Sequence, residues 1–563
     1  MRKVQKRITY FLPIYLVLAG SLFCIQLQAQ EQKVDTLKPI SNFKKWYQNL
    51  LPRSYTLIKN KLLMPMAVGY TDFDDNIRDL QLLGKLQPEQ SLTIRPFILT
   101  PKLSYDSLLA MIDPEFENHG HLVERKHTDI QLLPINFLQK YNSHHPYGWN
   151  DGPLSFSKGY QFVGSGGVYM RWRNIHLTLR PEYFKTASDP YETSPNWGQR
   201  TPALSRLTLG QSSLRVDFGP LSVGVSTQNL WRGPGHYSSL LMSNNAPGFN
   251  HFSIGLNRPL NTPIGSFQLA IVGGTLTANA IQGFENKFLK IYDINNNTRY
   301  LNLLSFTYNP SIFKNISLGL NRAFQQFTKL KPSNKLTDYY LITLNPLFRN
   351  QYRDDNAPID QLISGFAKYI FTNEHAEIYY EYGWNDGSSN LRDLNLEVAH
   401  SAASIFGLKK ITYLNFNTFL NIEIEATKMA QSPNYLLRNA GNWYEHGQLG
   451  EGYTNQNQIL GSGSGFGNNI QTLNINWNKN WTKIGIQFQH IAQNPIRLIS
   501  DWQNLYLGKV DWDDYSYGVK LKFKYKKILF NTNIELVHSK NYLWQNNNNV
   551  SNLFVFFNTI YLW

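Results

Sequence analysis

Two short clusters in the sequence combine aromatic rings with amide or carboxylate groups. They are Tyr147, Trp149 and Asp151, and Trp384, Asn385 and Asp386. Aromatic rings stack on the apolar C–H face of a sugar ring, and amides and carboxylates hydrogen-bond to its hydroxyls. Both clusters are therefore candidates for polysaccharide binding. Asn and Asp beside Gly also favour tight turns for purely local reasons, so a structural role in turns is the alternative for each.

A block rich in Gly and Pro lies between residues 226 and 249. Its distinctive members are Trp231, Gly233, Pro234, Gly235, Ser243, Asn244 and Asn245. Gly and Pro at such density give the backbone a fixed and unusual path. The block predicts a shaped loop more readily than a binding site.

Pairs of carboxylates at short spacing raise the question of glycoside hydrolysis. Glu377 and Glu381, and also Glu423 and Glu425, share one face of a strand. Acidic residues at this spacing are more typical of a strand face that meets water than of a glycosidase pair. The sequence has no Gly-x-Ser-x-Gly, His-Glu-x-x-His or EF-hand pattern. We therefore expect a protein without catalytic residues or cofactor.

Histidines gather before and at the start of the strand-rich region. They are His119, His121, His127, His144 and His145. The one cysteine, Cys24, lies in the first 29 residues, so a mature chain would offer no thiolate to a metal. Without thiolates or spaced acidic partners, no metal site is expected.

The chain is basic, with 54 Lys and Arg against 39 Asp and Glu and a formal charge of +15. Lys520, Lys522 and Lys524 alternate along one predicted strand. This arrangement fits an interior that attracts anions better than a nucleic-acid patch, in which basic residues cluster on one surface. No nucleic-acid partner is expected.

Alternating apolar and polar residues dominate the chain, and this period of two is typical of β-strands. In residues 414–427 the apolar side chains are Leu414, Phe416, Leu420, Ile422, Ile424 and Ala426. Aromatic residues make up 14% of the chain, although its mean hydropathy is only −0.37. Long amphipathic strands with aromatic girdles account for both values. The predicted fold is all-β, an antiparallel transmembrane barrel of the outer membrane.

The end of the chain supports the same fold independently. Counted back from Trp563, every second residue is apolar or aromatic except Thr559. This pattern looks like the C-terminal strand by which the barrel-assembly machinery recognises outer-membrane proteins. Residues 131–563 would supply roughly 16–20 strands at the usual length of a strand plus a turn.

The first 130 residues have a different character. Residues 1–29 combine a basic start, a short apolar core and a small residue, Ala29, which predicts a cleaved signal peptide. An uncleaved anchor helix is the alternative. Residues 30–130 carry two helix-like segments, 76–84 and Tyr105–Ile112, and predict a small periplasmic helical region.

Several segments resemble, in the same order, the Wzi family of capsule assembly proteins. The most specific are residues 226–235 and 238–249, and the others are 78–80, 93–96, 146–152, 158–161, 381–386, 400–401, 452–454 and 460–461. The resemblance spans roughly residues 70–563. It departs from the family pattern at Asn455, where a His often follows Gly-Tyr-Thr.

The resemblance implies a barrel of eighteen strands with a periplasmic helical bundle and with extracellular loops folded over the lumen. It also implies a lectin-like role, in which the protein attaches or organises capsular or extracellular polysaccharide at the cell surface. Outer-membrane lipid and lipopolysaccharide would surround such a barrel. A porin, or a channel for solutes or polysaccharide, is the alternative function.

Overall fold

The computed structural model divides the chain into two compact units, residues 1–58 and 59–563, and the described residues all belong to the second. They are residues 68–69, 73–86, 91–98, 105–113, 121–125, 127–192, 203–277, 298–313, 315–328, 359–385, 399–415, 418–431, 441–446, 449, 452–494 and 510–563. The predicted signal peptide lies outside the described residues and stays a prediction.

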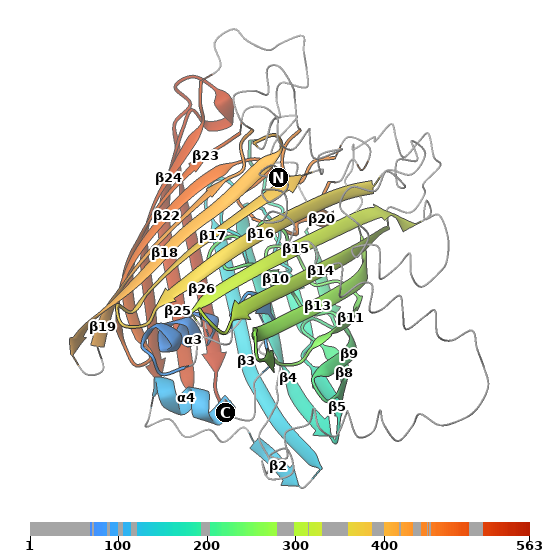
Figure 1. The fold of residues 1–563 in the computed structure, drawn as a ribbon. Coiled ribbons are helices and arrows are strands. Elements are labelled where there is room, and N and C mark those ends of the chain that lie inside the picture. The colour runs from blue at the N-terminus through green and yellow to red at the C-terminus, as the bar shows by residue number, and fades with distance from the viewer. Residues whose placement is uncertain are drawn as a thin grey trace, which may run out of the picture. The chain divides into compact units, whose positions relative to one another are not determined.

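The described elements are two helices, one short 3-10 turn and a long series of strands (Figure 1). They are α3 (Phe73–Leu82), β1 (Ile94–Arg95), α4 (Tyr105–Ile112), β2 (His121–Arg125), β3 (Thr128–Asn142), β4 (Gly159–Trp172), β5 (Ile175–Leu179), β6 (Glu182–Lys185), β7 (Ser205–Thr208), β8 (Ser213–Phe218), β9 (Leu221–Ser226), β10 (Trp231–Arg232), β11 (His251–Leu256), β12 (Leu260–Thr262), β13 (Gly265–Leu276), β14 (Arg299–Pro310), β15 (Ile316–Phe327), β16 (Ile359–Phe371), β17 (Ala376–Asn385), β18 (Ala402–Asn415), β19 (Thr418–Lys428), β20 (Thr454–Asn455), β21 (Gln458–Ile459), β22 (Asn469–Lys479), β23 (Thr482–Ala492), β24 (Asp513–Tyr525), β25 (Ile528–Lys540), η8 (Tyr542–Trp544) and β26 (Val550–Tyr561).

All strands except β1, β10, β20 and β21 form one closed antiparallel barrel, in which the last strand, β26, pairs with β3. The four others form two small sheets, β1 with β10 and β20 with β21. Three of the barrel strands are interrupted and consist of two segments each: β5 with β6, β7 with β8, and β11 with β12. The short strand β2 pairs only with β3, beyond the end of β26, and is not counted separately. Counted this way, the barrel has eighteen strands. The predicted all-β barrel is confirmed.

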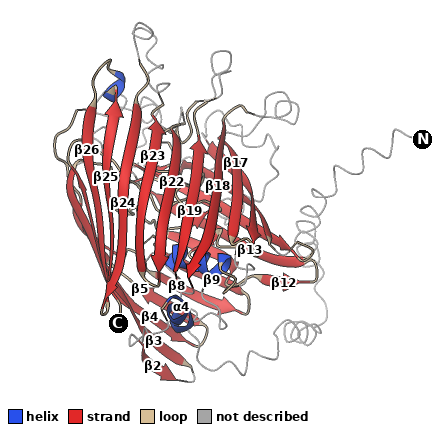
Figure 2. Cartoon of the chain, turned by 90° about the vertical axis from the view of Figure 1, so that its left-hand side faces the viewer, coloured by secondary structure: helices blue, strands red, loops and turns tan. Residues whose placement is uncertain are grey.

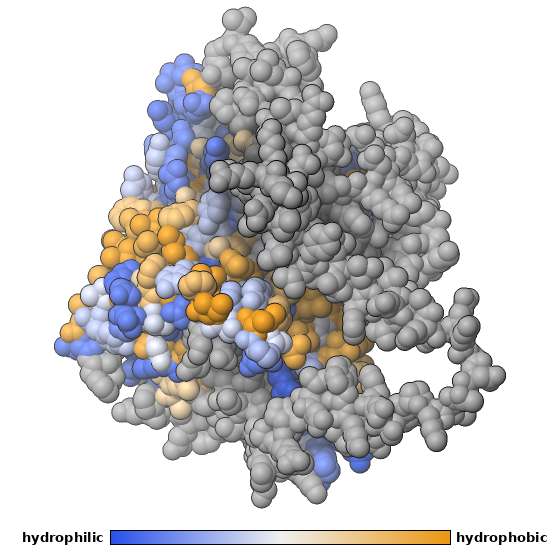
Figure 3. Space-filling model, in the orientation of Figure 1, coloured by the Kyte–Doolittle hydropathy of each residue, from blue (hydrophilic) through white to orange (hydrophobic). Residues whose placement is uncertain are grey.

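The period of two in the sequence separates the outer face of the barrel from its interior. In β24, Tyr517 and Val519 are 56% and 46% exposed, whereas Ser516 and Lys522 on the other face are buried. Apolar residues spread across the middle of the visible wall, with hydrophilic residues above them (Figure 3). Such a band is the surface that a bilayer covers. In the described part of the chain, no helix has the length and apolar character needed to cross a membrane.

The strand predicted over residues 414–427 is wrong in one respect, because it is two strands. β18 ends at Asn415 and β19 begins at Thr418, and these two residues pair with each other. A connection of two residues keeps the alternation in phase from one strand to the next. Periodicity alone therefore could not reveal the break.

The two ends of the barrel differ in the length of their connections (Figure 2). At one end the connections are short, such as residues 173–174 and 526–527, and we call this the short-turn end. At the other end, the long-loop end, the connections include residues 143–158 and 227–250. His375, in the turn between β16 and β17, hydrogen-bonds to the carbonyl of Leu82 at 2.7 Å, so α3 lies at the short-turn end.

The terminal tryptophan fastens β26 at the short-turn end. Its indole Nε1 donates a hydrogen bond of 2.7 Å to the carbonyl of Leu133 in β3, the strand that closes the barrel. The ring of Trp563 also packs edge-on against Tyr561, with the centroids 5.1 Å apart. We expect deletion of Trp563, or Trp563→Lys, to lower the folded fraction in the membrane, measured by heat-modifiable gel mobility.

The matched control for this prediction is Ile312→Lys. Ile312 is 85% exposed in the turn between β14 and β15, at the same end of the barrel. This variant likewise replaces an apolar side chain by a charged one, but it leaves the closing strands β26 and β3 unchanged. A normal folded fraction for Trp563→Lys would contradict the prediction.

Candidate functional site

Helix α3 packs inside the barrel against one part of its inner wall. Its apolar residues Phe73, Ile77 and Leu80 belong to one buried cluster with interior side chains of the barrel: Leu133, Tyr169, Trp481, Leu529, Ile560 and Leu562. Phe73 meets Trp481 edge-on, with ring centroids 5.9 Å apart. Gly84 follows the helix at φ 70°, a conformation that favours glycine at a helix end. A helix is therefore confirmed in the segment predicted over residues 76–84, although it begins earlier, at Phe73, and ends at Leu82. It occupies the lumen.

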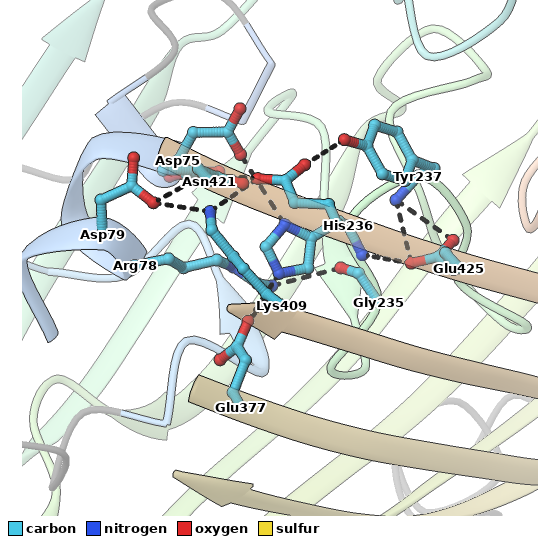
Figure 4. Close-up of polar contacts among 12 residues, drawn as sticks. Asp75, Arg78, Asp79, Gly235, His236, Tyr237, Glu377, Lys409, Asn421 and Glu425 are labelled. Atoms are coloured by element: carbon cyan, nitrogen blue, oxygen red, sulfur yellow. Dashed lines mark hydrogen bonds and ion pairs between the residues drawn. The ribbon is translucent and has the colours of Figure 1, made fainter. Parts of the chain in front are cut away.

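The polar side of α3 meets buried charges on β16 to β19. Asp79 is 2.7 Å from the Nζ of Lys409, which is also 2.8 Å from Glu423. Arg78 is 3.6 Å from Glu377, which pairs with Lys368 at 2.8 Å. Figure 4 shows Arg78 and Asp79 pointing from the helix toward these strands. Because a buried charge without a partner is costly, each of these groups depends on the others.

The glycine- and proline-rich block enters the lumen from the other end. It belongs to residues 227–250, the connection between β9 and β11, which we call the plug loop. Arg78 donates hydrogen bonds to the carbonyls of Pro234 and Gly235 at 2.9 and 3.2 Å. Arg232 of β10 pairs with Ile94 of β1. We call residues 73–86 and 91–98 the N-terminal segment. The N-terminal segment and the plug loop therefore form one packed unit inside the barrel.

Glycine at position 233 has a specific reason. Its φ is 133°, and a Cβ atom there would lie 2.7 Å from the carboxylate Oε2 of Glu381. Any side chain would strain the backbone and push on the wall of the barrel. The ring of Trp231 lies 4.4 Å below the guanidinium of Arg95. Trp231, Gly233, Pro234 and Gly235 thus build the contact with the N-terminal segment.

The second half of the block joins the plug loop to the other long loops. Ser243 donates to the carbonyl of Gly461 at 2.5 Å, and Asn245 donates to that of Ile459 at 2.9 Å. Asn244 donates to the carbonyl of Asn150 at 2.9 Å. Leu240, Leu241 and Met242 lie in a buried core that also includes Trp443, Tyr444, Tyr453 and Leu460. Ser243, Asn244 and Asn245 therefore hold together a layer of loops across the barrel.

His236 lies where the plug loop, α3 and the wall of the barrel meet (Figure 4). Its backbone N–H donates to Glu425 at 2.7 Å, and its Nε2 is 2.7 Å from Glu377. Its Nδ1 is buried without a hydrogen-bond partner, and the carboxylate of Asp75 lies 3.9 Å from it, beyond hydrogen-bond distance. This arrangement fits a neutral ring that donates through Nε2. Burial, with Arg78 nearby, lowers the pKa of His236 to about 4. No spacing pattern in the sequence could have indicated this residue, because its partners are more than 140 positions away.

Burial also lowers the pKa of two arginines in this region. It lowers the pKa of Arg232 to about 9, with Arg95 adding to the effect. It lowers the pKa of Arg95 to about 10, although Asp74 opposes the shift. Both guanidiniums remain charged at neutral pH. They therefore need the oxygen atoms around them: Arg95 has the carboxylate of Asp74 and the carbonyl of Gly235, and Arg232 has backbone carbonyls.

Acidification should lower the free energy of unfolding through buried histidines of the long loops. His236 and His145 are buried and neutral, with pKa values lowered to about 4 and about 3, whereas histidine in an unfolded chain titrates near 6.5. Between these values the unfolded state binds more protons, so the free energy of unfolding falls as the pH drops from about 6.5 toward 4. His236 alone corresponds to about 3 kcal/mol when this change is complete.

The measurement is the urea midpoint in detergent micelles at pH 7 and at pH 4.5. His236→Gln should reduce the difference between the two midpoints. His538→Gln is the control, because His538 is exposed on β25. Equal midpoints at the two pH values would contradict the assignment of a neutral buried His236.

The first aromatic–polar cluster lies together in the loop between β3 and β4. Tyr147 is only 4% exposed and donates to Gln489. Asp151 pairs with buried Lys140 at 2.6 Å. Trp149 is half-buried, and its ring centroid lies 5.7 Å from that of Tyr147. Two members of this cluster are thus engaged inside the protein, and Trp149 keeps an accessible part.

The structure does not bring the second cluster together. Trp384 and Asn385 end β17, where successive residues face opposite sides of the barrel. Trp384 is on the outer face and packs edge-on against Tyr382, with centroids 4.9 Å apart. Asn385 points inward and donates to the carbonyl of Asn442 at 3.1 Å. Asp386 lies outside the described residues.

The glutamates that suggested a hydrolase all face the interior and contact the plug or its supports. Glu377 and Glu425 bind His236, Glu423 binds Lys409, and Glu381 accepts from Ser364 at 2.7 Å. These contacts account for the spacing of the four glutamates on the inner strand faces, where they anchor the plug loop and its supports. In the ranges that the structure describes, no group of three or more His, Cys, Asp or Glu could hold a metal ion.

A model of the family described as capsule assembly protein Wzi matches residues 146–550, which is more than half of the chain. The chain belongs to the Wzi capsule assembly family. With its barrel fold, this membership places the protein in the outer membrane of a Gram-negative cell. No curated protein matches the sequence.

Among solved structures, the chain is similar to Wzi of Escherichia coli, described as an outer membrane protein involved in group 1 capsule assembly and a carbohydrate-binding β-barrel. The two share 14% identity and a TM-score of 0.59, over 88% of this chain and 99% of that one. OprD of Pseudomonas aeruginosa also matches, with 8% identity over 76% of this chain and 92% of that one. Its TM-score of 0.36 is too low to carry an argument.

Asn455, the departure from the Wzi pattern, has a structural role. It is buried in β20, donates to the carbonyl of Pro247 at 2.9 Å and accepts from the backbone N–H of Thr277 at 3.1 Å. Pro247 belongs to the plug loop and Thr277 follows β13. An amide can make both contacts at once, so Asn455 ties the loop layer to the wall.

Proposed function

We propose that this protein binds capsular or extracellular polysaccharide at the cell surface and retains it without forming covalent bonds. The observation that carries the proposal is a Wzi-family barrel whose lumen is filled from both ends by packed side chains. A barrel filled in this way offers its outer loops as a binding surface. The carbohydrate-binding relative from E. coli supports the choice of ligand.

The proposal includes an orientation. In bacterial outer-membrane barrels the short turns face the periplasm and the long loops face outward. By this rule the region of residues 30–130 lies on the periplasmic side, with α3 inserted into the lumen from that end, and the loop layer is extracellular. Residues 1–29 would direct secretion, and the barrel-assembly machinery would insert the strands.

A porin function is the alternative, and the contacts in the lumen count against it. A porin keeps a water-filled channel through its barrel. Here Arg78 of α3 reaches the carbonyls of Pro234 and Gly235, so elements from the two ends meet inside the barrel. Opening a path would break this contact and the buried ion pairs around it.

Weak contacts would suffice for retention because the ligand is a polymer. A stacked ring contributes on the order of 0.5–1.5 kcal/mol by analogy with aromatic contacts in proteins. Many barrels that bind one repeating chain raise its effective concentration at the surface. Trp149 is our candidate for such a contact, because it is half-buried in a long loop.

The experiment is binding of the cells' own purified polysaccharide to the purified protein in detergent micelles. We expect Trp149→Ala to weaken binding about threefold to tenfold, the loss of one stacked ring. Trp384→Ala is the matched control, since Trp384 lies on the outer face of β17 beside Tyr382. Equal weakening by both variants would contradict the assignment of Trp149, and no binding by the wild type would contradict the function.

A further inference from the structure

The charge of +15 is not explained by the interior of the barrel. Lys140, Lys368, Lys409 and Lys524 point inward, and each contacts a carboxylate: Asp151, Glu377, Asp79 and Asp113 respectively. Within the barrel, Asp74 is likewise paired with Arg95 at 3.1 Å. The interior is therefore largely neutralised, and the excess must lie elsewhere.

Exposed and half-exposed charges on the turns and strand ends differ between the two ends of the barrel. At the short-turn end we call seven of the described basic side chains the basic rim: Arg125, Arg173, Arg258, Lys410, Lys479, Lys526 and Lys527. Arg171 and Lys524 also lie near this end, but they pair with Asp129 and Asp113. One acidic side chain, Glu374, accompanies them there. At the long-loop end the described residues are balanced: Lys158, Lys185, Arg206, Lys428 and Lys540 against Asp189, Glu192, Glu445, Asp511 and Asp513.

Turn geometry does not select the basic residues of the rim. Arg173 and Lys526 begin two-residue turns with φ values of 55° and 52°, in the left-handed region. Gly and Asn are the residues that such turns favour. The equivalent position between β22 and β23 is Asn480, with φ 51°. A positive charge at Arg173 and Lys526 therefore serves something other than the turn.

Two rim residues lie directly beside aromatic rings that face outward. The guanidinium of Arg173 is 5.5 Å from the centroid of Trp172, and the Nζ of Lys526 is 5.5 Å from that of Tyr525. Trp172 and Tyr525 are 55% and 61% exposed. Outward Trp and Tyr rings at the ends of barrel strands mark the boundary between hydrocarbon and head groups. The adjacent cations are then at the level of lipid phosphates.

We propose that the basic rim binds the anionic head groups of phospholipids in the leaflet at the short-turn end. The rim residues are distributed around the barrel, on the β4–β5, β22–β23 and β24–β25 hairpins and, for Arg258, at the break between β11 and β12. A ring of separate charges fits a surrounding layer of lipid better than it fits one compact partner. Anionic lipid attracts each Lys or Arg near its surface, and salt weakens the attraction.

The test uses the full chain in lipid nanodiscs made from phosphatidylglycerol and phosphatidylcholine, with native mass spectrometry to count retained lipids. The wild type should retain phosphatidylglycerol in preference to phosphatidylcholine, and more weakly in high salt. The double variant Arg173→Asn and Lys526→Asn should lower this preference by roughly tenfold. Asn suits both turns, so the thermal stability of this double variant should equal or exceed that of the wild type.

The control is the double variant Lys428→Asn and Lys540→Asn, which removes the same charge from the long-loop end. It should keep the preference for phosphatidylglycerol. An unchanged preference in the rim variant, or equal loss in both variants, would overturn the proposal. A second assay measures binding of dextran sulfate to the protein in pure phosphatidylcholine nanodiscs. If the rim variant loses this binding but keeps its preference for phosphatidylglycerol, the rim serves a soluble polyanion and the proposal is overturned.

Discussion

Replacing residues 233–246 with a Gly–Ser sequence of equal length should convert a non-conducting barrel into an ion channel. The replacement removes His236, whose backbone and ring bind Glu425 and Glu377, and it removes Leu240 to Met242 from the buried core of the loop layer. It also releases the carbonyls that Arg78 holds. Gly and Ser cannot supply the lost apolar burial, so the segment should leave the lumen.

Single-channel recordings in planar bilayers measure this effect. The wild type should show almost no conductance, and the variant should show frequent large steps. The control replaces Gln545 to Asn549, mostly exposed residues of the loop between β25 and β26, by Gly and Ser. Heat-modifiable gel mobility confirms that both variants fold. Large channels in the wild type, or a folded plug variant that stays closed, would contradict a lumen sealed by the plug loop.

A narrower variant tests the same contact with less risk to folding. Arg78→Met with Glu377→Met removes both partners of one buried pair, and such paired replacements are often tolerated. It leaves Lys368 without its carboxylate, so Lys368→Met completes the set. We expect this triple variant to show brief channel openings in the same bilayer recordings. If these charges did not hold the plug loop, the folded variant would stay closed.

Local patterns in the sequence were enough to predict the barrel. Residue alternation identifies strands such as β17, β24 and β26, because successive side chains of a strand face opposite sides. In a barrel one of these faces is polar and the other is apolar, whichever strands lie on either side. The helix α4 has the bounds predicted for it, Tyr105–Ile112. The same reasoning failed at the junction of β18 and β19, since a two-residue connection preserves the alternation.

The inside of the barrel could not be predicted in this way. Arg78 and Glu377 are almost 300 positions apart, and no spacing rule joins them. The Gly and Pro content of the plug loop correctly indicated a shaped loop, but not that its carbonyls face a buried arginine. Trp384 and Asn385 looked like one cluster in the sequence, although neighbouring residues of a strand face opposite sides.

Loss of the whole protein should release polysaccharide from cells without stopping its synthesis. The proposed role is retention, and the glutamates that could suggest catalysis are engaged with the plug and its supports. A strain without the protein should therefore make polymer of normal composition and chain length. Because attachment depends on many weak contacts along one chain, its loss should move most of the polymer into the medium.

The most direct test of the account is the division of polysaccharide between cells and medium in a deletion strain. Uronic acid or total sugar would be measured in both fractions, with chain length checked on gels, and a plasmid copy of the wild type would serve as the complemented control. If the protein retains polymer by non-covalent binding, the total should be unchanged, the cell-bound fraction should fall strongly, and complementation should restore it. Polymer missing from both fractions would instead show a role in synthesis or export and would contradict retention by non-covalent binding.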